Sequence, residues 1–486
     1  MWTTRPSSAR SRTRRSGMRA WPAMVCCIRR SRYSSEAFPS GSHVSERCLI
    51  AAFMLALGPA CSPSKPSADD GVASSVDSGL STIEDEAPGD PGDDGGDTSD
   101  TDSDTGSDTG ADTGDGDPEA SYPLLPATPL RTQGRWVLDA DGSRFKLASV
   151  NWYGFEELDH VPAGLEVRHV DDIAQTIAAL GFNSVRLPFS LEMVEATEPV
   201  GEIPLAANPD LVGRTPIEVM DAVIDALARA GLVVILDNHS SEAVWYSAEN
   251  GLWYTDEYPE STWIADWVFL AERYGDHPAV VGYDLRNELR NGATWGGPAE
   301  TNWKAAVERV SDAIFAVDSE SLIVVAGVAY GSDFSGAYYD PLVLSVPNRL
   351  VYTPHDYSWF HGTLTSYEDL AADLGGWWGF LIVEDQPWTA PVWVGEFGTC
   401  NTSVACVEAS TDVNGIWFDL FLDYLAAGDI DWAYWPVNGT MARADDREFG
   451  ATDWFGVLDR TWSEPSLPEL LDGLQAIQDP WAFPAE

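Results

Sequence analysis

The 486-residue sequence predicts an α/β protein built on a (β/α)8 TIM barrel, preceded by a signal-like or lipoprotein-like segment and a disordered acidic linker. From residue 122 onward, apolar segments of strand length alternate with amphipathic segments of helical periodicity. The strand segments are almost continuously apolar, which is typical of parallel strands buried on both faces. We therefore expect three regions: an N-terminal extension and export signal at 1–61, the linker at 62–121 and the barrel at 122–486.

Eight segments have the length and composition of barrel strands: 146–153, 183–189, 232–239, 280–288, 322–328, 350–357, 391–398 and 431–438. Helical spacing of apolar residues predicts helices that include 170–180, 216–230, 300–317 and 412–427. An Asp-Gly turn between two alternating runs at 135–147 predicts a hairpin that closes the bottom of the barrel.

The charge balance excludes one class of function. The chain has 77 Asp plus Glu against 28 Lys plus Arg, a formal net charge of −49. Such an excess of negative charge repels nucleic acid and anionic lipid, so binding to either through an overall basic surface is ruled out. The 21 Trp, 16 Tyr and 17 Phe exceed what packing usually needs, so some are available to contact a ligand.

The first two regions differ in composition from the barrel. Residues 48–60 form an apolar stretch that is too short to span a bilayer but suits the core of an export signal. Cys61 follows directly, as in the lipobox of bacterial lipoproteins. This position predicts lipidation at Cys61 and a lipid anchor to an outer membrane. The alternative is cleavage by an ordinary signal peptidase near Ala60. Residues 1–43 are interpreted as an untranslated or unstructured extension, and 62–121 as a solvated tether rather than a calcium site. We expect an exported protein, extracellular or anchored at the cell surface.

Chemically capable side chains gather at the carboxyl ends of the predicted strands, where a barrel of this class carries its active site. This set comprises Arg186, His239, Asn287, Glu288, His355, Tyr357, Glu396 and Trp435. A structural ion network is the alternative, but no core needs two carboxylates, two His and an Arg at one end.

Two carboxyl groups facing an aromatic wall are what the cleavage of a glycosidic bond requires. One protonates the leaving oxygen, and the other attacks the anomeric carbon or activates a water molecule. Glu288 and Glu396 form the candidate pair, with Asn287 positioned to bind the sugar 2-hydroxyl. Arg186 and Tyr357 are placed to hold Glu396 ionised, and Trp435 offers a flat face for a pyranose ring.

The strings VNWYGFE, GFNSVRLPFS, LDNH, YDLRNE, TPHDY, VGEFG and WAYWPVN resemble the ordered motifs of glycoside hydrolase family 5, the cellulase-containing family, over residues 126–480. The sequence is most similar to the bacterial endo-β-1,4-glucanases of that family. The resemblance implies retention of configuration, with Glu396 as nucleophile and Glu288 as acid/base, and hence carboxyl groups roughly 5–5.5 Å apart. Leu289 stands where the family more often has Pro.

The leading hypothesis is an endo-glucanase acting on a β-1,4-glucan polysaccharide or oligosaccharide. The alternatives are the same chemistry on mannan, xyloglucan, β-1,3-glucan or a glycolipid glycan, and a carbohydrate-binding lipoprotein without activity. We expect a monomer that needs no metal and no organic cofactor.

Aromatic residues in the loops after the strands are candidate sugar platforms, of which Trp245, Trp295 and Trp359 are the first choices because they closely follow catalytic strands. The remaining candidates are Trp152, Tyr153, Trp253, Tyr254, Trp377, Trp378 and Trp454. Cys400 and Cys406 lie close together in a protein that we expect to be exported, which predicts a disulfide beside Glu396.

Overall fold

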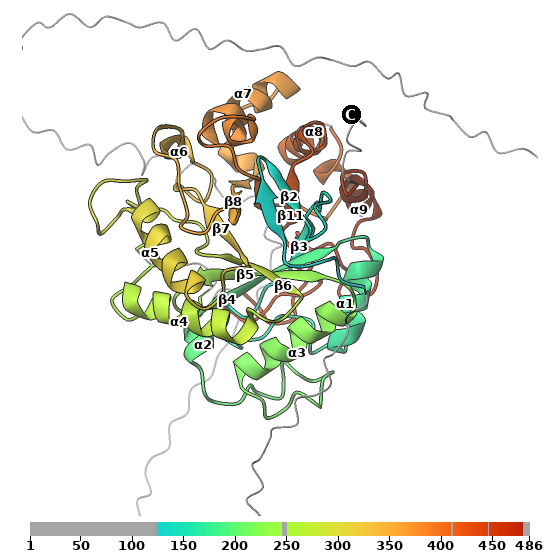
Figure 1. The fold of residues 1–486 in the computed structure, drawn as a ribbon. Coiled ribbons are helices and arrows are strands. Elements are labelled where there is room, and N and C mark those ends of the chain that lie inside the picture. The colour runs from blue at the N-terminus through green and yellow to red at the C-terminus, as the bar shows by residue number, and fades with distance from the viewer. Residues whose placement is uncertain (1–121, 123, 245–249, 410–411, 446, 480–486) are drawn as a thin grey trace, which may run out of the picture. The chain divides into compact units, whose positions relative to one another are not determined.

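A computed structural model describes residues 122, 124–244, 250–409, 412–445 and 447–479, and its centre is a ring of parallel strands (Figure 1). The strands are β3 (Ala148–Asn151), β4 (Ser184–Ser190), β5 (Val233–Ser240), β6 (Val280–Asp284), β7 (Leu322–Ala326), β8 (Leu350–Thr353), β9 (His355–Asp356), β10 (Trp393–Phe397) and β11 (Asp431–Tyr434). They follow the order β8-β7-β6-β5-β4-β3-β11-β10-β9.

The two ends of this order belong to one interrupted strand. Pro354 separates β8 from β9, because a proline has no backbone N–H to continue the ladder. β8 pairs with β7 and β9 pairs with β10, and the Tyr352 N–H also donates to the Pro391 carbonyl at 2.9 Å. The ring is therefore closed, and each predicted strand segment overlaps one of its eight strands, which confirms the predicted (β/α)8 barrel.

Helices lie outside the ring of strands (Figure 1). The longer ones are α1 (Val170–Ala179), α3 (Pro216–Arg229), α4 (Glu260–Tyr274), α5 (Trp303–Phe315), α7 (Tyr367–Trp377), α8 (Val413–Gly428) and α9 (Pro468–Gln475). The short ones are α2 (Leu191–Glu195), α6 (Ser335–Tyr339) and the 3-10 turns η1 (Ser358–Phe360), η2 (Gly379–Ile382) and η3 (Val404–Cys406). Among the described helices, none combines the length and apolar character that spanning a membrane requires.

α3 illustrates why these segments form helices. Its apolar residues fall on one face, and Thr215 and Glu218 form a capping box around the first turn, with Pro216 at the first helical position. The helix ends at Ala230, and Gly231 then adopts a φ of +82°, a conformation that favours glycine.

An antiparallel hairpin covers the amino-terminal end of the barrel, as predicted, but its main pairing differs from the expected one. β1 (Arg131–Gln133) pairs with β2 (Trp136–Leu138). The Asp-Gly turn in the predicted segment 135–147 joins β2 to the following residues, and the Phe145 N–H donates to the Val137 carbonyl at 3.0 Å.

This hairpin packs into the barrel interior. Leu130 and Val137 belong to a buried apolar cluster whose other fully buried members come mostly from the barrel strands: Leu147, Val233, Ile235, Val281, Leu322, Val324, Val351, Trp393 and Ala433. Burial of these side chains closes one end of the barrel and leaves the carboxyl ends of the strands as the place for a site.

Candidate active site

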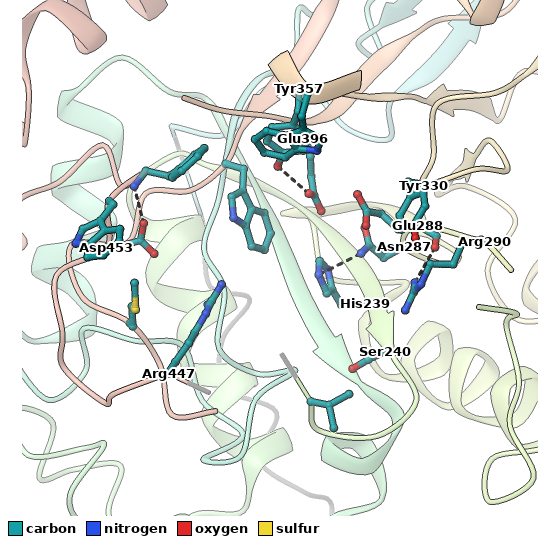
Figure 2. A pocket seen from close by; sticks show the side chains of 16 residues that line it. His239, Ser240, Asn287, Glu288, Arg290, Tyr330, Tyr357, Glu396, Arg447 and Asp453 are labelled. Atoms are coloured by element: carbon teal, nitrogen blue, oxygen red, sulfur yellow. Dashed lines mark hydrogen bonds between the residues drawn. The ribbon is translucent and has the colours of Figure 1, made fainter. Parts of the chain in front are cut away.

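A cleft of about 490 Å³ opens among the loops that follow the strands (Figure 2). It is lined by His239, Ser240, Val244, Asn287, Glu288, Arg290, Tyr330, Tyr357, Trp359, Glu396, Trp435, Met441, Arg447, Asp453, Trp454 and Phe455. Six of the eight predicted site residues line this cleft. The other two, Arg186 and His355, lie beneath its floor with no exposed surface and contact the lining residues directly.

Arg186 organises the floor of the cleft from its place on β4. Its Nη1 donates to Glu396 Oε1 at 2.7 Å, and its Nη2 donates to Asn287 Oδ1 at 3.0 Å. Its remaining donors contact Asp237 and Asp284 at 3.0 and 2.9 Å. Burial alone would lower the pKa of Arg186, but the three carboxylates around it raise that pKa, so the guanidinium remains charged.

Glu396 sits near the end of β10 with both carboxyl oxygens engaged. Besides the contact with Arg186, its Oε2 accepts a hydrogen bond from the Tyr357 hydroxyl at 3.1 Å. The burial of Tyr357 and the nearby Glu396 raise the pKa of that phenol well above its usual value, so the hydroxyl remains a donor. The two donors fix the direction of the Glu396 carboxylate.

Glu288 follows β6 on a short loop and has different surroundings. Its backbone φ is +38°, a left-handed conformation that costs a non-glycine residue about 1–3 kcal/mol and is common at functional sites. Its Oε1 lies 3.2 Å from Nδ1 of His355. Desolvation raises the pKa of Glu288, against the opposing effect of His239, Arg290 and Arg186. Burial also lowers the pKa of His355, so a neutral imidazole faces the Glu288 carboxyl group.

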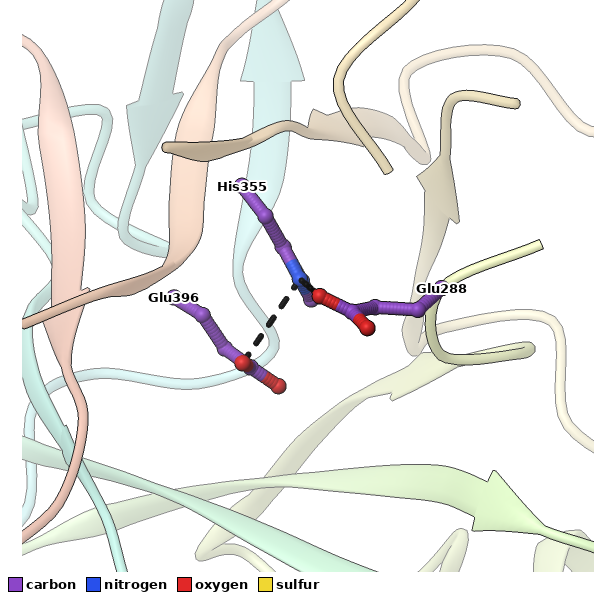
Figure 3. Close-up of side chains that lie close together, drawn as sticks. All are labelled: Glu288, His355 and Glu396. Atoms are coloured by element: carbon purple, nitrogen blue, oxygen red, sulfur yellow. Dashed lines mark hydrogen bonds and ion pairs between the residues drawn. The ribbon is translucent and has the colours of Figure 1, made fainter. Parts of the chain in front are cut away.

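The two carboxyl groups face one another across His355 (Figure 3). One oxygen of Glu288, one of Glu396 and a ring nitrogen of His355 all lie within 4.8 Å of one another. Oxygens this close are compatible with the roughly 5–5.5 Å between the carboxyl groups of a retaining glycosidase. The same three atoms are of the type that can contact a cation, but Arg186 already pairs with Glu396, and proton transfer explains the spacing without an ion.

His239 and Asn287 form a chain of hydrogen bonds along the floor. His239 Nδ1 lies 2.7 Å from Asp237 Oδ2, and its Nε2 lies 3.1 Å from Asn287 Nδ2. Burial lowers the pKa of His239 to about 4, so the ring is neutral near pH 7. A neutral ring that donates from Nδ1 to the Asp237 carboxylate accepts at Nε2 from Asn287. The Asn287 amide is thus held from both sides, with one N–H left to face the cleft.

Aromatic side chains form one wall of the cleft. The Trp435 ring lies nearly parallel to the rings of Tyr153 and His239, whose centroids are 5.3 and 5.4 Å away, and Trp435 is 7% exposed. Trp359 stacks on Tyr357 at 4.4 Å and is 60% exposed. Flat apolar faces held rigidly in this way are suited to the faces of pyranose rings.

The three predicted sugar platforms have different outcomes. Trp359 lines the cleft. Trp295 does not: its ring packs against Phe334 and Tyr352, and its indole N–H donates to the Asp340 carbonyl at 2.9 Å. The loop after β6 directs this side chain toward α6, where Trp295 packs as part of the structure and does not reach the cleft. Trp245 lies outside the described residues.

A disulfide joins Cys400 and Cys406, whose Cα atoms are 5.4 Å apart, in the loop that follows Glu396. Asn401 lies inside this loop and donates from its backbone N–H to the Trp454 carbonyl at 2.7 Å. The bridged loop therefore supports the segment that carries Trp454, an exposed ring on the cleft wall that was among the wider set of aromatic candidates.

Several residues of the site were not predicted. Asp237 and Asp284 hold Arg186 from below, and their signal in the sequence was a charged residue within an otherwise apolar strand. The segment after β11 contributes Met441, Arg447, Asp453 and Phe455, and the loops after β6 and β7 contribute Arg290 and Tyr330. These loop residues carry no periodicity that would have identified them.

The comparisons with known proteins agree with this geometry. A family model described as cellulase (glycosyl hydrolase family 5) matches residues 138–440. An endoglucanase from Paenibacillus polymyxa is 35% identical over 353 residues, which is 69% of this chain and 84% of that protein. The major extracellular endoglucanase of Xanthomonas campestris pv. campestris is 39% identical over 235 residues, 46% of this chain and 48% of that protein.

Solved structures are similar over the barrel. The catalytic domain of the major endoglucanase from Xanthomonas campestris pv. campestris superposes with a TM-score of 0.62 at 30% identity, covering 72% of this chain and 99% of that domain. An endocellulase from Pyrococcus horikoshii, solved in complex with cellotetraose, gives a TM-score of 0.62 at 26% identity and covers 73% of this chain and all of that one.

Proposed function

The chain belongs to the cellulase family, glycosyl hydrolase family 5, and from this we propose that it is an endo-acting β-1,4-glucanase that retains anomeric configuration, with Glu396 as nucleophile and Glu288 as acid/base. The observation that carries the assignment is the asymmetry of the two carboxyl groups. They lie close enough for double displacement, yet Arg186 contacts the Glu396 carboxylate, while burial raises the pKa of Glu288.

The first step transfers the sugar to the enzyme. The Glu396 oxygen forms a bond to the anomeric carbon as the bond from that carbon to the leaving oxygen breaks, and the Glu288 proton passes to the leaving oxygen. Arg186 and Tyr357 hold the attacking carboxylate in line, and His355 orients the Glu288 carboxyl group.

The second step restores the enzyme. A water molecule enters the place of the departed sugar and gives a proton to ionised Glu288, and its oxygen forms a bond to the anomeric carbon as the Glu396 carboxylate leaves. Positive charge develops on the sugar ring in both transition states. The free N–H of Asn287 binds the 2-hydroxyl of that ring, and Trp435 supports its apolar face.

A glucan chain fits the rest of the cleft. Trp359 and Trp454 are 60% and 63% exposed and line the cleft on the side of Glu396 and the segment after β11. Their rings are available to stack on successive glucose units, so the substrate is a polysaccharide or oligosaccharide.

Export is the second part of the proposal. The apolar stretch at 48–60 has the character of an export signal, and the relative from Xanthomonas campestris is named an extracellular enzyme. We propose that this chain is secreted as well, with lipidation at Cys61 as the route to the cell surface. Both features lie outside the described residues.

Release of reducing ends tests the activity. The purified protein is assayed on carboxymethyl-cellulose, mixed-linkage glucan, xyloglucan, mannan, xylan and β-1,3-glucan, beside Glu396→Gln and Glu288→Gln. We expect hydrolysis of β-1,4-glucans, a drop of about 1,000-fold or more in Glu396→Gln, and a first-formed product that NMR identifies as the β-anomer. Activity confined to another polymer would overturn the substrate, an α-anomer would overturn the mechanism, and binding without hydrolysis would overturn both.

A further inference from the structure

Arg290 lines the cleft two residues after the proposed acid/base and has no part in the mechanism above. Its Nη1 donates to the main-chain carbonyl of Glu288 at 2.9 Å. Its guanidinium carbon lies 5.8 Å from the ring centroid of Tyr330, which is 40% exposed. A guanidinium that faces an aromatic ring and a main-chain carbonyl is held in one orientation.

The main chain around this pair is tightly constrained. The Arg290 N–H donates to the Gly251 carbonyl, and the Tyr330 N–H donates to the Leu289 carbonyl, each at 2.8 Å. A Cβ at Gly251, whose φ is +78°, would lie 2.6 Å from the Arg290 side chain, so the close approach requires glycine. Tyr330 itself has a φ of +61°. Two separate loops therefore hold Arg290 and Tyr330 in a preorganised corner of the cleft.

This corner lies on one side of the bond to be cleaved. Glu396 attacks the sugar that stays on the enzyme, and Glu288 protonates the oxygen of the sugar that departs. Figure 2 places Arg290 and Tyr330 beside Glu288 and away from Glu396, at the opposite end of the cleft from Arg447 and Asp453. The departing sugar must therefore pass this corner.

We propose that Arg290 and Tyr330 form the leaving-group subsite, with Arg290 binding hydroxyl groups of the departing glucan and Tyr330 supporting its ring. The proposal rests on the assignment of Glu288 as acid/base. A guanidinium offers several fixed N–H donors to sugar hydroxyls, and its stacking on Tyr330 lowers the entropy cost of binding.

Arg290 has a second effect through its charge. Desolvation raises the pKa of Glu288, and the positive charge of Arg290 is one of the influences that lower it. The other charged or titratable groups near Glu288 are His239, Arg186, His355, Glu396, Asp237 and Tyr357. Removal of the Arg290 charge leaves these in place and raises the pKa of Glu288, so the protonated acid persists to higher pH.

Two substrates separate this role from a merely structural one. Cellotetraose needs both a departing sugar and a proton, whereas 2,4-dinitrophenyl β-cellobioside releases a stable phenolate and needs neither. For Arg290→Met we expect kcat/KM for cellotetraose to fall about 10-fold and kcat/KM for the aryl cellobioside to stay within about twofold. We also expect the alkaline limb of the pH profile of kcat/KM for cellotetraose to move to higher pH.

Two companion variants divide the effect. Arg290→Lys keeps the charge and is expected to restore the alkaline limb but not the full cellotetraose rate. Tyr330→Leu loses the ring without the charge and is expected to slow cellotetraose cleavage with the pH limb unmoved. Equal losses on both substrates, with an unchanged pH limb in Arg290→Met, would contradict the proposal. A wild-type protein inactive on both substrates would contradict the proposed function itself.

Discussion

At the scale of single residues, the two carboxyl groups of the cleft have different neighbours. Arg186 donates a hydrogen bond to the carboxylate of Glu396 and none to that of Glu288. Its Nη1 lies 2.7 Å from Glu396, whereas the Glu288 carboxyl group faces the neutral imidazole of His355 at 3.2 Å. Burial favours the protonated form of Glu288, whereas the Glu396 carboxylate lies against a guanidinium and a phenol hydroxyl. The assignment of nucleophile and acid follows from these surroundings and not from residue type, since both are Glu.

The protonation of Glu288 predicts the pH profile. Burial raises the pKa of Glu288, and the first step needs its protonated form, so the alkaline limb of kcat/KM for cello-oligosaccharides is expected above the ordinary pKa of a Glu carboxyl group. In Glu288→Gln this alkaline limb should vanish. The rate on an aryl cellobioside, whose leaving group needs no proton, should fall far less than the rate on cellotetraose. A limb that persists in this variant would assign the acid to another group.

Tyr357 predicts a second effect. Tyr357→Phe removes the hydrogen bond to Glu396 Oε2 and keeps the ring that stacks on Trp359. We expect kcat to fall about 10-fold to 100-fold with a smaller change in KM, because the lost donor orients the nucleophile. Tyr338→Phe, at a 44% exposed ring on α6, is the matched control and should retain full activity. A Tyr357→Phe variant with wild-type kcat would show that Arg186 alone positions Glu396.

At the scale of elements, the barrel strands and the loops behave differently. Strand register brings His355 and Glu396 together, since Glu396 on β10 pairs with His355 on β9. Arg186 reaches Glu396 from β4 through its long side chain. The loops carry the rest of the cleft and need their own supports. The bridged loop after β10 is one such support, because Asn401 within it contacts the backbone of the segment after β11 at three carbonyls, those of Trp454, Asp453 and Gly456.

The disulfide is expected to contribute to stability and to the shape of the cleft. A loop of this length closed by a disulfide stabilises the fold by about 2 kcal/mol in the chain-entropy model. The double variant Cys400→Ser, Cys406→Ser should therefore show a lower Tm, and a loss of kcat/KM on polymeric glucan that exceeds the loss on the aryl cellobioside. The wild-type protein under reducing conditions should behave in the same way. Unchanged Tm and activity after complete reduction would show that the bridge has no such role.

At the scale of the whole molecule, the described residues from Tyr122 onward contain the closed barrel, its plugged end and every residue of the proposed mechanism. The hairpin residues Leu130 and Val137 fill the amino-terminal end, so the site lies at the other end by the geometry of the fold. The acidic segment at 62–121 has too little apolar content to form a core and lies outside the described residues.

This division predicts the result of truncation. A protein that begins at Tyr122 should fold, melt cooperatively and hydrolyse soluble β-1,4-glucan with kcat/KM within about twofold of the longer chain, because no residue of the cleft is removed. A chain that begins at Gly142 would lose Leu130 and Val137 from the barrel interior, and we expect it to be insoluble or to melt well below the longer form. Equal stability of the two would contradict the role of the hairpin as a plug.

The sequence by itself determined the barrel and most of its floor. The alternation of apolar and amphipathic segments indicates which segments are buried. Polar residues at the carboxyl ends of the apolar strands meet at one rim of the barrel, independently of the conformation of the loops. This is why Arg186, His239, Glu288 and Glu396 could be predicted to lie together before any coordinates were known. The Asp residues that hold Arg186 were missed, although charges within apolar strands marked them.

Only the tertiary structure decided the walls of the cleft. Trp295 and Trp454 were both candidate platforms in loops, yet the first packs against Phe334 and the second lines the cleft. Arg290 and Tyr330 come from different loops and meet only because those loops are tied together by main-chain hydrogen bonds. The conformation of a loop depends on contacts with distant segments, which periodicity in a single sequence does not report, whereas the register of a closed barrel follows from the strands themselves.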